Sequence, residues 1–318
     1  MGRYLGMRLL QTLVVLLIVT TSVFFMVNLL PGDPVYIYAQ SDNLTQDQYN
    51  VIYHQLNLDQ PLVTRYFTWV GDVLKGDFGI SYKYHVPVWS IISSRIGITL
   101  YLATLATIIG MPIGILFGIL TAIKRGSWTD TVITILANIT GCLPVFWIAV
   151  CLLYFFSMKL NWLPSTGFVW PWVDFPQHVR HLIMPLFCLA LGGIANTARQ
   201  TRSSMLEVIR QDYIRTARSK GLPENKVITV HMLKNALLPI VTLFGTRLAM
   251  MIGGSMFVET VFNIPGMGTL IVNCISFRDV PTVQALVLIT AVVCCTAFIL
   301  MDILYVVVDP RISLTAKE

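Results

Sequence analysis

Long stretches without a charged residue alternate with short polar segments along this chain of 318 residues. The first stretch covers residues 9–30, and a helix of that length rises about 33 Å at ~1.5 Å per residue, enough to cross a hydrocarbon layer of ~30 Å. Five further stretches are also apolar, although the last two each contain one charged residue, Arg247 and Asp302. They cover residues 96–123, 131–158, 182–198, 235–258 and 281–308. The pattern predicts an all-α membrane protein with six transmembrane helices.

The first stretch has two interpretations. Arg3 and Arg8 precede it, and a basic segment before an apolar one is also how a secretory signal peptide begins. The apolar part is longer than the ~7–15 residues usual in a signal peptide, and no small-x-small cleavage site follows Pro31 and Gly32. We therefore expect an uncleaved anchor helix.

Composition and charge agree with a membrane protein. Hydrophobic residues make up 55% of the chain and charged residues 12%, whereas roughly 25% are charged in an ordinary globular domain. If the N-terminus is cytoplasmic, six spans place 14 Lys and Arg residues on that side and 7 on the other, so the positive-inside rule puts both termini in the cytoplasm. The net charge is +6. We expect the basic residues that produce it to contact anionic membrane lipid and not nucleic acid.

The polar segments divide the chain into four parts. Residues 1–30 form a cytoplasmic N-terminus and the first helix, and residues 31–95 form a large extracytoplasmic segment. Residues 96–308 form a core of five helices with a cytoplasmic loop at 205–234, and residues 309–318 form a cytoplasmic tail. Pro31 and Pro34 stop the first helix at the start of the large segment, and we expect a short helix within residues 43–58.

The last of three predicted extracytoplasmic segments, residues 259–280, combines bend-forming residues with apolar neighbours. Its centre consists of Asn263, Pro265, Gly266, Met267 and Gly268. Pro and Gly together favour a bend, and irregular backbone at membrane depth must be shielded by protein or line a cavity. Two interpretations remain open, a re-entrant gate or plug and a hairpin packed on the outer helix ends.

The cytoplasmic loop is a long basic segment between strongly apolar ones. A helix continuing from the fourth span to residue 220 would place four residues on its apolar face: Leu206, Ile209, Tyr213 and Ala217. Gly221 suits the left-handed turn that ends a helix, and Pro223 and Glu224 suit the first turn of the next. The pair could lie on lipid headgroups, but we favour a rigid knob that docks on a cytoplasmic protein.

Residues 215–221, followed by an apolar segment that ends at Pro239, resemble the cytoplasmic loop of ABC importer permeases. That loop has the pattern Glu-Ala-Ala, three residues, Gly and a later Pro. Ala217 and Gly221 match it, whereas Arg215 and Thr216 replace the Glu and the first Ala. This replacement is the pattern of the dipeptide, oligopeptide and nickel branch. Further motifs of that branch occur in order at residues 31–34, 58–62, 77–81, 162–164, 259–262, 265–268, 278–279 and 309–312.

The resemblance covers the whole length and implies the first of two paired permeases, with a type I importer bundle. It implies uptake of dipeptides or oligopeptides, with a nickel chelate or glutathione as the alternative solute. The implied partners are a second homologous permease, two cytoplasmic ATPases and an extracytoplasmic binding protein, in a bacterial or archaeal cytoplasmic membrane. The residues implied to couple to the ATPases are Tyr213, Arg215, Thr216, Ala217, Arg218, Lys220, Gly221, Leu222, Pro223 and Glu224.

The chain lacks the Gly-x-x-x-x-Gly-Lys-Ser/Thr sequence of a phosphate-binding loop. We therefore expect ATP and magnesium on the partner ATPases, and no catalytic, cofactor or metal site in this chain. A secondary transporter is the alternative from another class. It would usually show internal repeats and membrane-embedded ionisable groups for ion coupling, and the two halves of this sequence do not repeat each other convincingly.

Polar and small residues inside the spans have structural and functional interpretations. An unpaired charge at the membrane centre costs at least ~2.5 kcal/mol, so Arg247 could line the path and meet a peptide carboxylate, or could pair with Asp302 or the partner permease. We favour pairing. Gly110, Gly114 and Gly118 recur every four residues, which predicts close helix packing.

Overall fold

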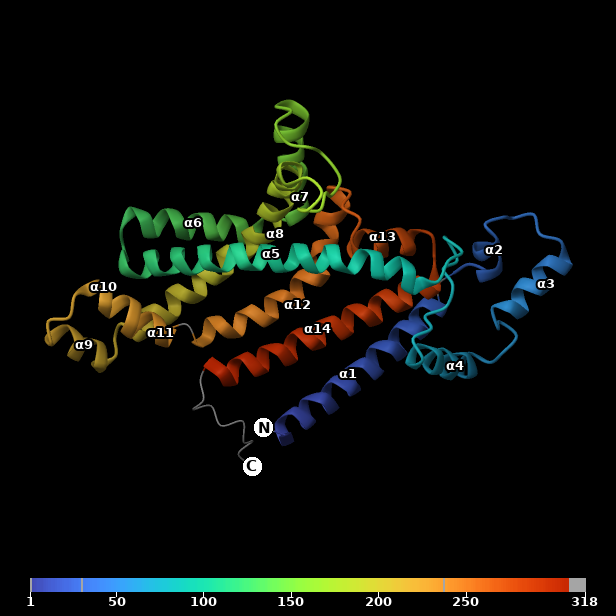
Figure 1. The fold of residues 1–318 in the computed structure, drawn as a ribbon, viewed down its shortest axis with the longest axis horizontal. Helices are drawn as coiled ribbons and strands as arrows, with labels where there is room; N and C mark the ends of the chain where they lie inside the picture. The colour runs from blue at the N-terminus through green and yellow to red at the C-terminus, as the bar shows by residue number, and fades with distance from the viewer. Residues whose placement is uncertain (1, 30, 237, 309–318) are drawn as a thin grey trace. The chain divides into compact units, whose positions relative to one another are not determined.

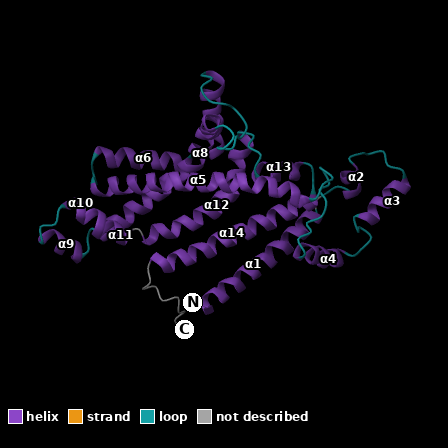
Figure 2. Ribbon diagram, viewed as in Figure 1, coloured by secondary structure: helices purple, strands orange, loops and turns teal. Residues whose placement is uncertain are grey.

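The computed structural model describes residues 2–29, 31–236 and 238–308. Helices dominate this part of the chain, whose one extended pairing is an isolated bridge between Ile80 and Pro87 (Figure 1, Figure 2). Unit 1 comprises Met1–Thr99 with Pro265–Cys295, and unit 2 comprises Leu100–Ile264 with Thr296–Glu318. The helices α5 (Val88–Ile123) and α14 (Val280–Val308) begin in unit 1 and end in unit 2. The all-α prediction is confirmed.

Unit 1 contains α1 (Gly2–Asn28) and three short helices that follow it. They are α2 (Pro34–Ala39), α3 (Gln46–Gln55) and α4 (Leu62–Leu74). The Asp33 carboxylate begins α2 by accepting a hydrogen bond from the Val35 amide at 2.9 Å. Thr45 and Gln48 form a capping box at the start of α3. The short helix expected within residues 43–58 is α3, and α4 adds to the predicted elements.

A buried carboxylate joins two distant segments of unit 1. Asp279 is fully buried and accepts hydrogen bonds from the hydroxyls of Ser81 and Thr282 and from the Tyr82 amide. A buried charge is tolerated only when such donors replace its water. The neighbouring core consists mainly of side chains from α5, α13 (Met267–Ser276) and α14: Val88, Ile92, Met267, Leu270, Cys274, Val283, Ala285, Leu286 and Ile289. The loop before α5 and the turn before α14 are therefore held together.

Unit 2 is built around α8 (Phe175–Val208), against which several helices pack (Figure 1). They include α6 (Trp128–Cys142), α7 (Val145–Leu152) and α12 (Leu238–Val261). A π-helical segment, η1 (Leu153–Lys159), continues α7.

The glycines of α5 lie directly against the backbone of α8. A Cβ atom at Gly110 would be 3.3 Å from the Cβ of Ala190, and one at Gly118 would be 2.3 Å from the Cβ of Thr201. At Gly114 the corresponding distance, to Thr197, is 2.7 Å. No real side chain fits at the last two distances without movement of a neighbour. The predicted close packing is confirmed, and its partner is the fourth span.

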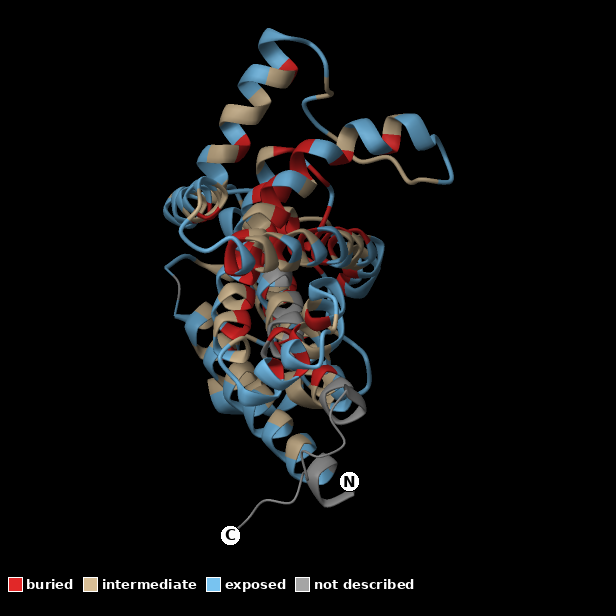
Figure 3. Cartoon of the chain, turned by 90° about the vertical axis from the view of Figure 1, so that its left-hand side faces the viewer, coloured by how far each residue is buried: buried red, intermediate tan, exposed pale blue. Residues whose placement is uncertain are grey.

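Four of the described helices are long and apolar enough to cross a bilayer: Gly6–Asn28, Val88–Ile123, Phe175–Val208 and Val280–Ile303. A fifth crossing results if α6 and the segment Val145–Lys159 are counted as one broken span. This count does not reach the predicted six, although α12 also covers most of the predicted run at 235–258. Most of the described α1 side chains are exposed or half-buried, the classes drawn pale blue and tan in Figure 3, so α1 requires an apolar environment outside its own chain.

The third predicted span, residues 131–158, is not one straight helix. The helix α6 ends at Cys142, and the next segment leaves at an angle of 101°. Pro144 lacks an amide hydrogen and its ring disfavours helical geometry at Leu143, whose ψ is 131°. The prediction was wrong here because the absence of charge marks the membrane but does not report a bend.

Replacement of Gly118 with alanine should destabilise the protein, because the added methyl group overlaps Thr201. Overpacking of this kind costs about 1–3 kcal/mol, and the midpoint of thermal unfolding in detergent should fall. Gly192 lies in α8, where an added methyl group would meet nothing within 4 Å, so Gly192→Ala is the matched control and should hold or raise the midpoint. Equal midpoints for the two variants would contradict the close contact.

Candidate functional site

The predicted coupling loop is a sequence of short helices that joins α8 to α12 in unit 2. After α8 ends at Val208, α9 (Asp212–Ser219), α10 (Glu224–Lys226), the π-helical η2 (Val227–Met232) and α11 (Leu233–Ala236) follow. The predicted continuous helix to residue 220 is therefore wrong. Ile209 caps α8, and Gln211 adopts extended backbone with ψ 145°. Asp212 then begins α9, where an acidic residue is favourable in the first turn.

The corner after α9 has the predicted geometry. Gly221 has φ +72°, a left-handed conformation that side chains with a Cβ rarely adopt. Its amide bonds the Arg218 carbonyl at 2.9 Å, and Pro223 stands immediately before α10. A Cβ atom at Gly221 would meet nothing within 4 Å. The requirement for glycine here comes from backbone conformation and not from crowding.

The base of this element is buried in unit 2. Its apolar cluster comprises Ala122, Met205, Ile214, Ala217, Val227, Met232 and Ala236. Ile214 is fully buried, whereas Tyr213 is 43% exposed. The predicted apolar face contained Tyr213 and not Ile214, and it was wrong because the break at residues 209–211 rotates α9 relative to a straight extension of α8. The sequence does contain one indication that Ile214 is buried. Ile214 is the one aliphatic residue larger than alanine in α9, and its neighbours are mostly polar.

The other predicted coupling residues are distributed between surface and core. Ala217 is buried and Leu222 is half-buried against the same cluster. The remaining members form an exposed surface around the corner: Tyr213, Arg215, Thr216, Arg218, Lys220, Gly221, Pro223 and Glu224. The Tyr213 hydroxyl accepts a hydrogen bond from the side-chain amide of Asn235 at 3.0 Å, which orients the tyrosine ring.

A bidentate ion pair closes the corner. Arg218 donates to both carboxylate oxygens of Glu224, with its Nη2 at 2.6 Å and its Nε at 3.2 Å. These hydrogen bonds lower the pKa of the Glu224 carboxyl and raise that of the Arg218 guanidinium. The two side chains are 41% and 54% exposed, so water screens the pair. Arg218, predicted to couple to an ATPase, is thus paired within its own chain with Glu224, across the turn at Gly221.

The predicted gate residues lie on either side of the boundary between the units. In unit 2, Asn263 adopts a left-handed conformation with φ 48° just after α12. In unit 1, Pro265 is followed by Gly266, which caps α13, and Met267 and Gly268 form the buried first turn. The Met267 amide donates to the Thr99 hydroxyl at 2.8 Å. Met267 and Gly268 are thus packed in a short helix.

The intramembrane charges lie on α12 and α14. The Arg247 guanidinium approaches α8 so closely that a Cβ atom at Gly193 would overlap it. Asp302 is half-buried on α14. Their pairing, and a role in the path, stay predictions. Among the described residues, no group of three or more His, Cys, Asp or Glu side chains could hold a metal ion.

Comparisons with known proteins identify a family over nearly the whole chain. The pattern described as binding-protein-dependent transport system inner membrane component matches residues 114–314, and the N-terminal pattern of the same membrane component matches residues 1–103. A Brucella ovis protein whose name describes a peptide permease is 40% identical over 319 residues, covering 99% of this chain and 100% of that protein. The oligopeptide transport system permease protein AppB of Bacillus subtilis is 38% identical, covering 98% and 100%.

A solved structure has the same fold. The inward-facing MetNI methionine ABC transporter aligns with a TM-score of 0.57 at 17% identity, covering 69% of this chain and 96% of that chain. At this identity the likeness extends to the fold alone.

Replacement of Glu224 with glutamine should loosen the corner. Backbone amides at residues 221–226 should exchange hydrogen up to about fivefold faster at neutral pH, the factor that matches ~1 kcal/mol for an exposed pair. Because the pKa of Glu224 is lowered in the folded state, the pair stabilises the corner above the unfolded-state pKa. It is lost as pH falls through the lowered folded-state value.

The wild-type protein should therefore match Glu224→Gln in acid and differ from it at neutral pH. Arg215→Gln is the matched control, because Arg215 is exposed on α9 and forms no ion pair with a described residue. Identical exchange of wild type and Glu224→Gln at neutral pH would show that the pair does not order the corner.

Proposed function

Since the chain belongs to the family of binding-protein-dependent transport system inner membrane components, we propose that it forms half of the membrane path of an ATP-driven peptide importer. Members of this family are non-catalytic membrane components, and the chain is a multi-pass permease. The names of its full-length relatives favour peptides as the solute over a nickel chelate or glutathione.

The observation that carries the proposal is an exposed corner on a buried base. Ile214 and Ala217 fix α9 to the end of α8 and to η2, while the surface around Gly221 is exposed. A force applied to this surface is therefore transmitted to α8 at one end and, through α11, to α12 at the other. We infer that a cytoplasmic ATPase docks here and that its closure on ATP moves both helices.

The remaining assembly follows from this role. A second homologous permease completes the path, two cytoplasmic ATPases bind ATP and magnesium, and an extracytoplasmic binding protein delivers the peptide. The coupling element and both termini face the cytoplasm, and residues 31–95 face the binding protein, in the cytoplasmic membrane of a bacterium or archaeon. Six crossings result when α12 and the broken α6–α7 pair each count as one.

Replacement of Gly221 with valine should uncouple transport from ATP hydrolysis. A β-branched residue at φ +72° costs about 1–3 kcal/mol of backbone strain, which the exposed corner relieves by changing shape. The variant should reach the membrane and copurify with its partners, but peptide and binding protein should no longer stimulate ATP hydrolysis. Gly221→Asn should retain most of the stimulation, because asparagine tolerates left-handed backbone. Full stimulation of the valine variant would refute the coupling role.

Tyr213 and Ile214 should separate docking from folding. Ile214→Ala removes a fully buried side chain, at a cost of about 2–5 kcal/mol, and should lower both the unfolding midpoint and the yield of assembled complex. Tyr213→Ala should leave the midpoint unchanged and reduce peptide-stimulated ATP hydrolysis. If the tyrosine variant behaves as wild type in the hydrolysis assay, this surface does not contact the ATPase.

A further inference from the structure

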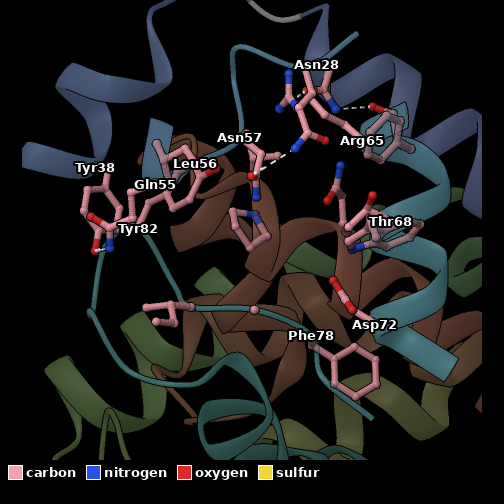
Figure 4. Close-up of a pocket in the computed structure, with 18 residues that line it drawn as sticks. Asn28, Tyr38, Gln55, Leu56, Asn57, Arg65, Thr68, Asp72, Phe78 and Tyr82 are labelled. Atoms are coloured by element: carbon pink, nitrogen blue, oxygen red, sulfur yellow. Dashed lines mark hydrogen bonds between the residues drawn. The ribbon is translucent and has the colours of Figure 1, made fainter. Parts of the chain in front are cut away.

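Two cavities in unit 1 share Arg65 in their walls. The first has a volume of about 260 Å³. Figure 4 shows Thr68 and Asp72 of α4 on one side of it, with Tyr38 and Tyr82 across the opening. The second has a volume of about 340 Å³ and shares Asn28, Arg65, Tyr82 and Val280 with the first. The second cavity is distinguished by two arginines in its wall, Arg65 and Arg278.

Both arginines lack a carboxylate partner within the described part of the chain, where neither guanidinium forms an ion pair. The Nη2 of Arg65 donates to the side-chain oxygen of Asn28 at 3.1 Å, which leaves its other donors available. Arg278, in the turn between α13 and α14, is exposed.

The backbone is shaped to admit the second guanidinium. A Cβ atom at Gly32 would lie 2.5 Å from Nη1 of Arg278, so no other residue leaves room for this side chain in its present position. Gly32 also has φ +130°, and Arg278 itself adopts a left-handed conformation with φ 55°. Left-handed backbone at a residue with a Cβ is uncommon and costly. Two sequence motifs, at residues 31–34 and 278–279, thus lie side by side and place the Arg278 guanidinium in the cavity wall.

The acid in this cavity is already engaged. One oxygen of Asp33 accepts the Val35 amide at 2.9 Å, and the other accepts the Tyr49 hydroxyl at 2.8 Å. That hydrogen bond raises the pKa of Tyr49 to about 12, and burial raises the pKa of Tyr82 to about 12. Both tyrosines are therefore neutral at pH 7. With two arginines and one aspartate, the lining carries a net positive charge.

We propose that this cavity is a socket for a single carboxylate, presented by an acidic side chain of the extracytoplasmic binding protein. A guanidinium pairs with a carboxylate through parallel hydrogen bonds. A free peptide also carries an ammonium group, for which this lining offers one carboxylate, Asp33, whose two oxygens each already accept a hydrogen bond, against two guanidiniums that would repel it. A lone acidic side chain therefore fits better than a zwitterion. The inference rests on the proposed function, which places residues 31–95 toward the binding protein.

The test is titration of the binding protein against the complete transporter in proteoliposomes, with trialanine saturating. For the double variant Arg65→Gln, Arg278→Gln, the binding-protein concentration that gives half-maximal ATP hydrolysis should rise at least tenfold. The rate at saturation should be unchanged, because the socket acts on docking. The dependence of half-saturation on salt should weaken, since complementary charges mainly govern encounter.

Matched variants separate charge from folding. Arg95→Gln removes one positive charge from unit 1 without touching either cavity, and should leave half-saturation unchanged. Arg65→Lys with Arg278→Lys retains the charge but not the planar fork, and should give an intermediate value. Copurification of all subunits verifies assembly. One Asp→Lys or Glu→Lys variant of the binding protein should be rescued by Arg278→Glu.

Three outcomes would overturn the inference. Unchanged half-saturation in an assembled double variant shows that the socket does not dock the binding protein. If the variant instead raises the trialanine concentration needed at saturating binding protein, and C-terminally amidated trialanine shows no such change, the carboxylate belongs to the peptide. If peptide-loaded binding protein never stimulates the wild-type complex, the proposed function itself fails, and this inference fails with it.

Discussion

The close approach of α5 and α8 is the constraint on which unit 2 depends. In lipid, apolar side chains gain little by leaving the surrounding hydrocarbon, so helices associate mainly through tight contact and polar bonds. Glycines at every fourth position of α5 bring its backbone against Ala190, Thr197 and Thr201 of α8. Near the same end of α8, Arg202 pairs with Asp130 of α6 at 2.9 Å, so a third helix is tied to this pair. The last turns of α8 before α9 are therefore held on two sides.

Features that depend on local backbone chemistry could be predicted from the sequence. The uncharged runs located the long helices, and the glycine spacing indicated a packed face. Gly221 and Pro223 indicated the corner, because a left-handed residue and a helix start each require a particular residue type. The family itself could be identified because its motifs recur in order over the whole length.

Features that depend on tertiary packing could not be predicted from the sequence. The break at residues 209–211 was hidden because no glycine or proline marks it. That break changes which side of α9 is buried, so Ile214 took the place assigned to Tyr213. Arg218 was predicted to contact an ATPase. Its actual ion-pair partner, Glu224, comes next to it only because the chain turns at Gly221. The clustering of Gly32, Arg65 and Arg278 joins segments too distant for any local pattern. The bend at Pro144 is a different case, because the proline is a local signal that was missed when the run was interpreted from its lack of charge alone.

The Asp279 carboxylate also constrains the order in which the protein can be made. Its donor Ser81 lies 198 positions earlier in the chain, and all intervening residues must be synthesised before the hydrogen bond can form. At roughly 5–20 residues per second, that interval is about 10–40 s. During it, the Ser81 hydroxyl and the Tyr82 amide have no carboxylate to bind, and the first helices of unit 1 lack α13 and α14. The N-terminal part of unit 1 is thus translated first, but its buried contact with Asp279 forms only after most of the chain has been made.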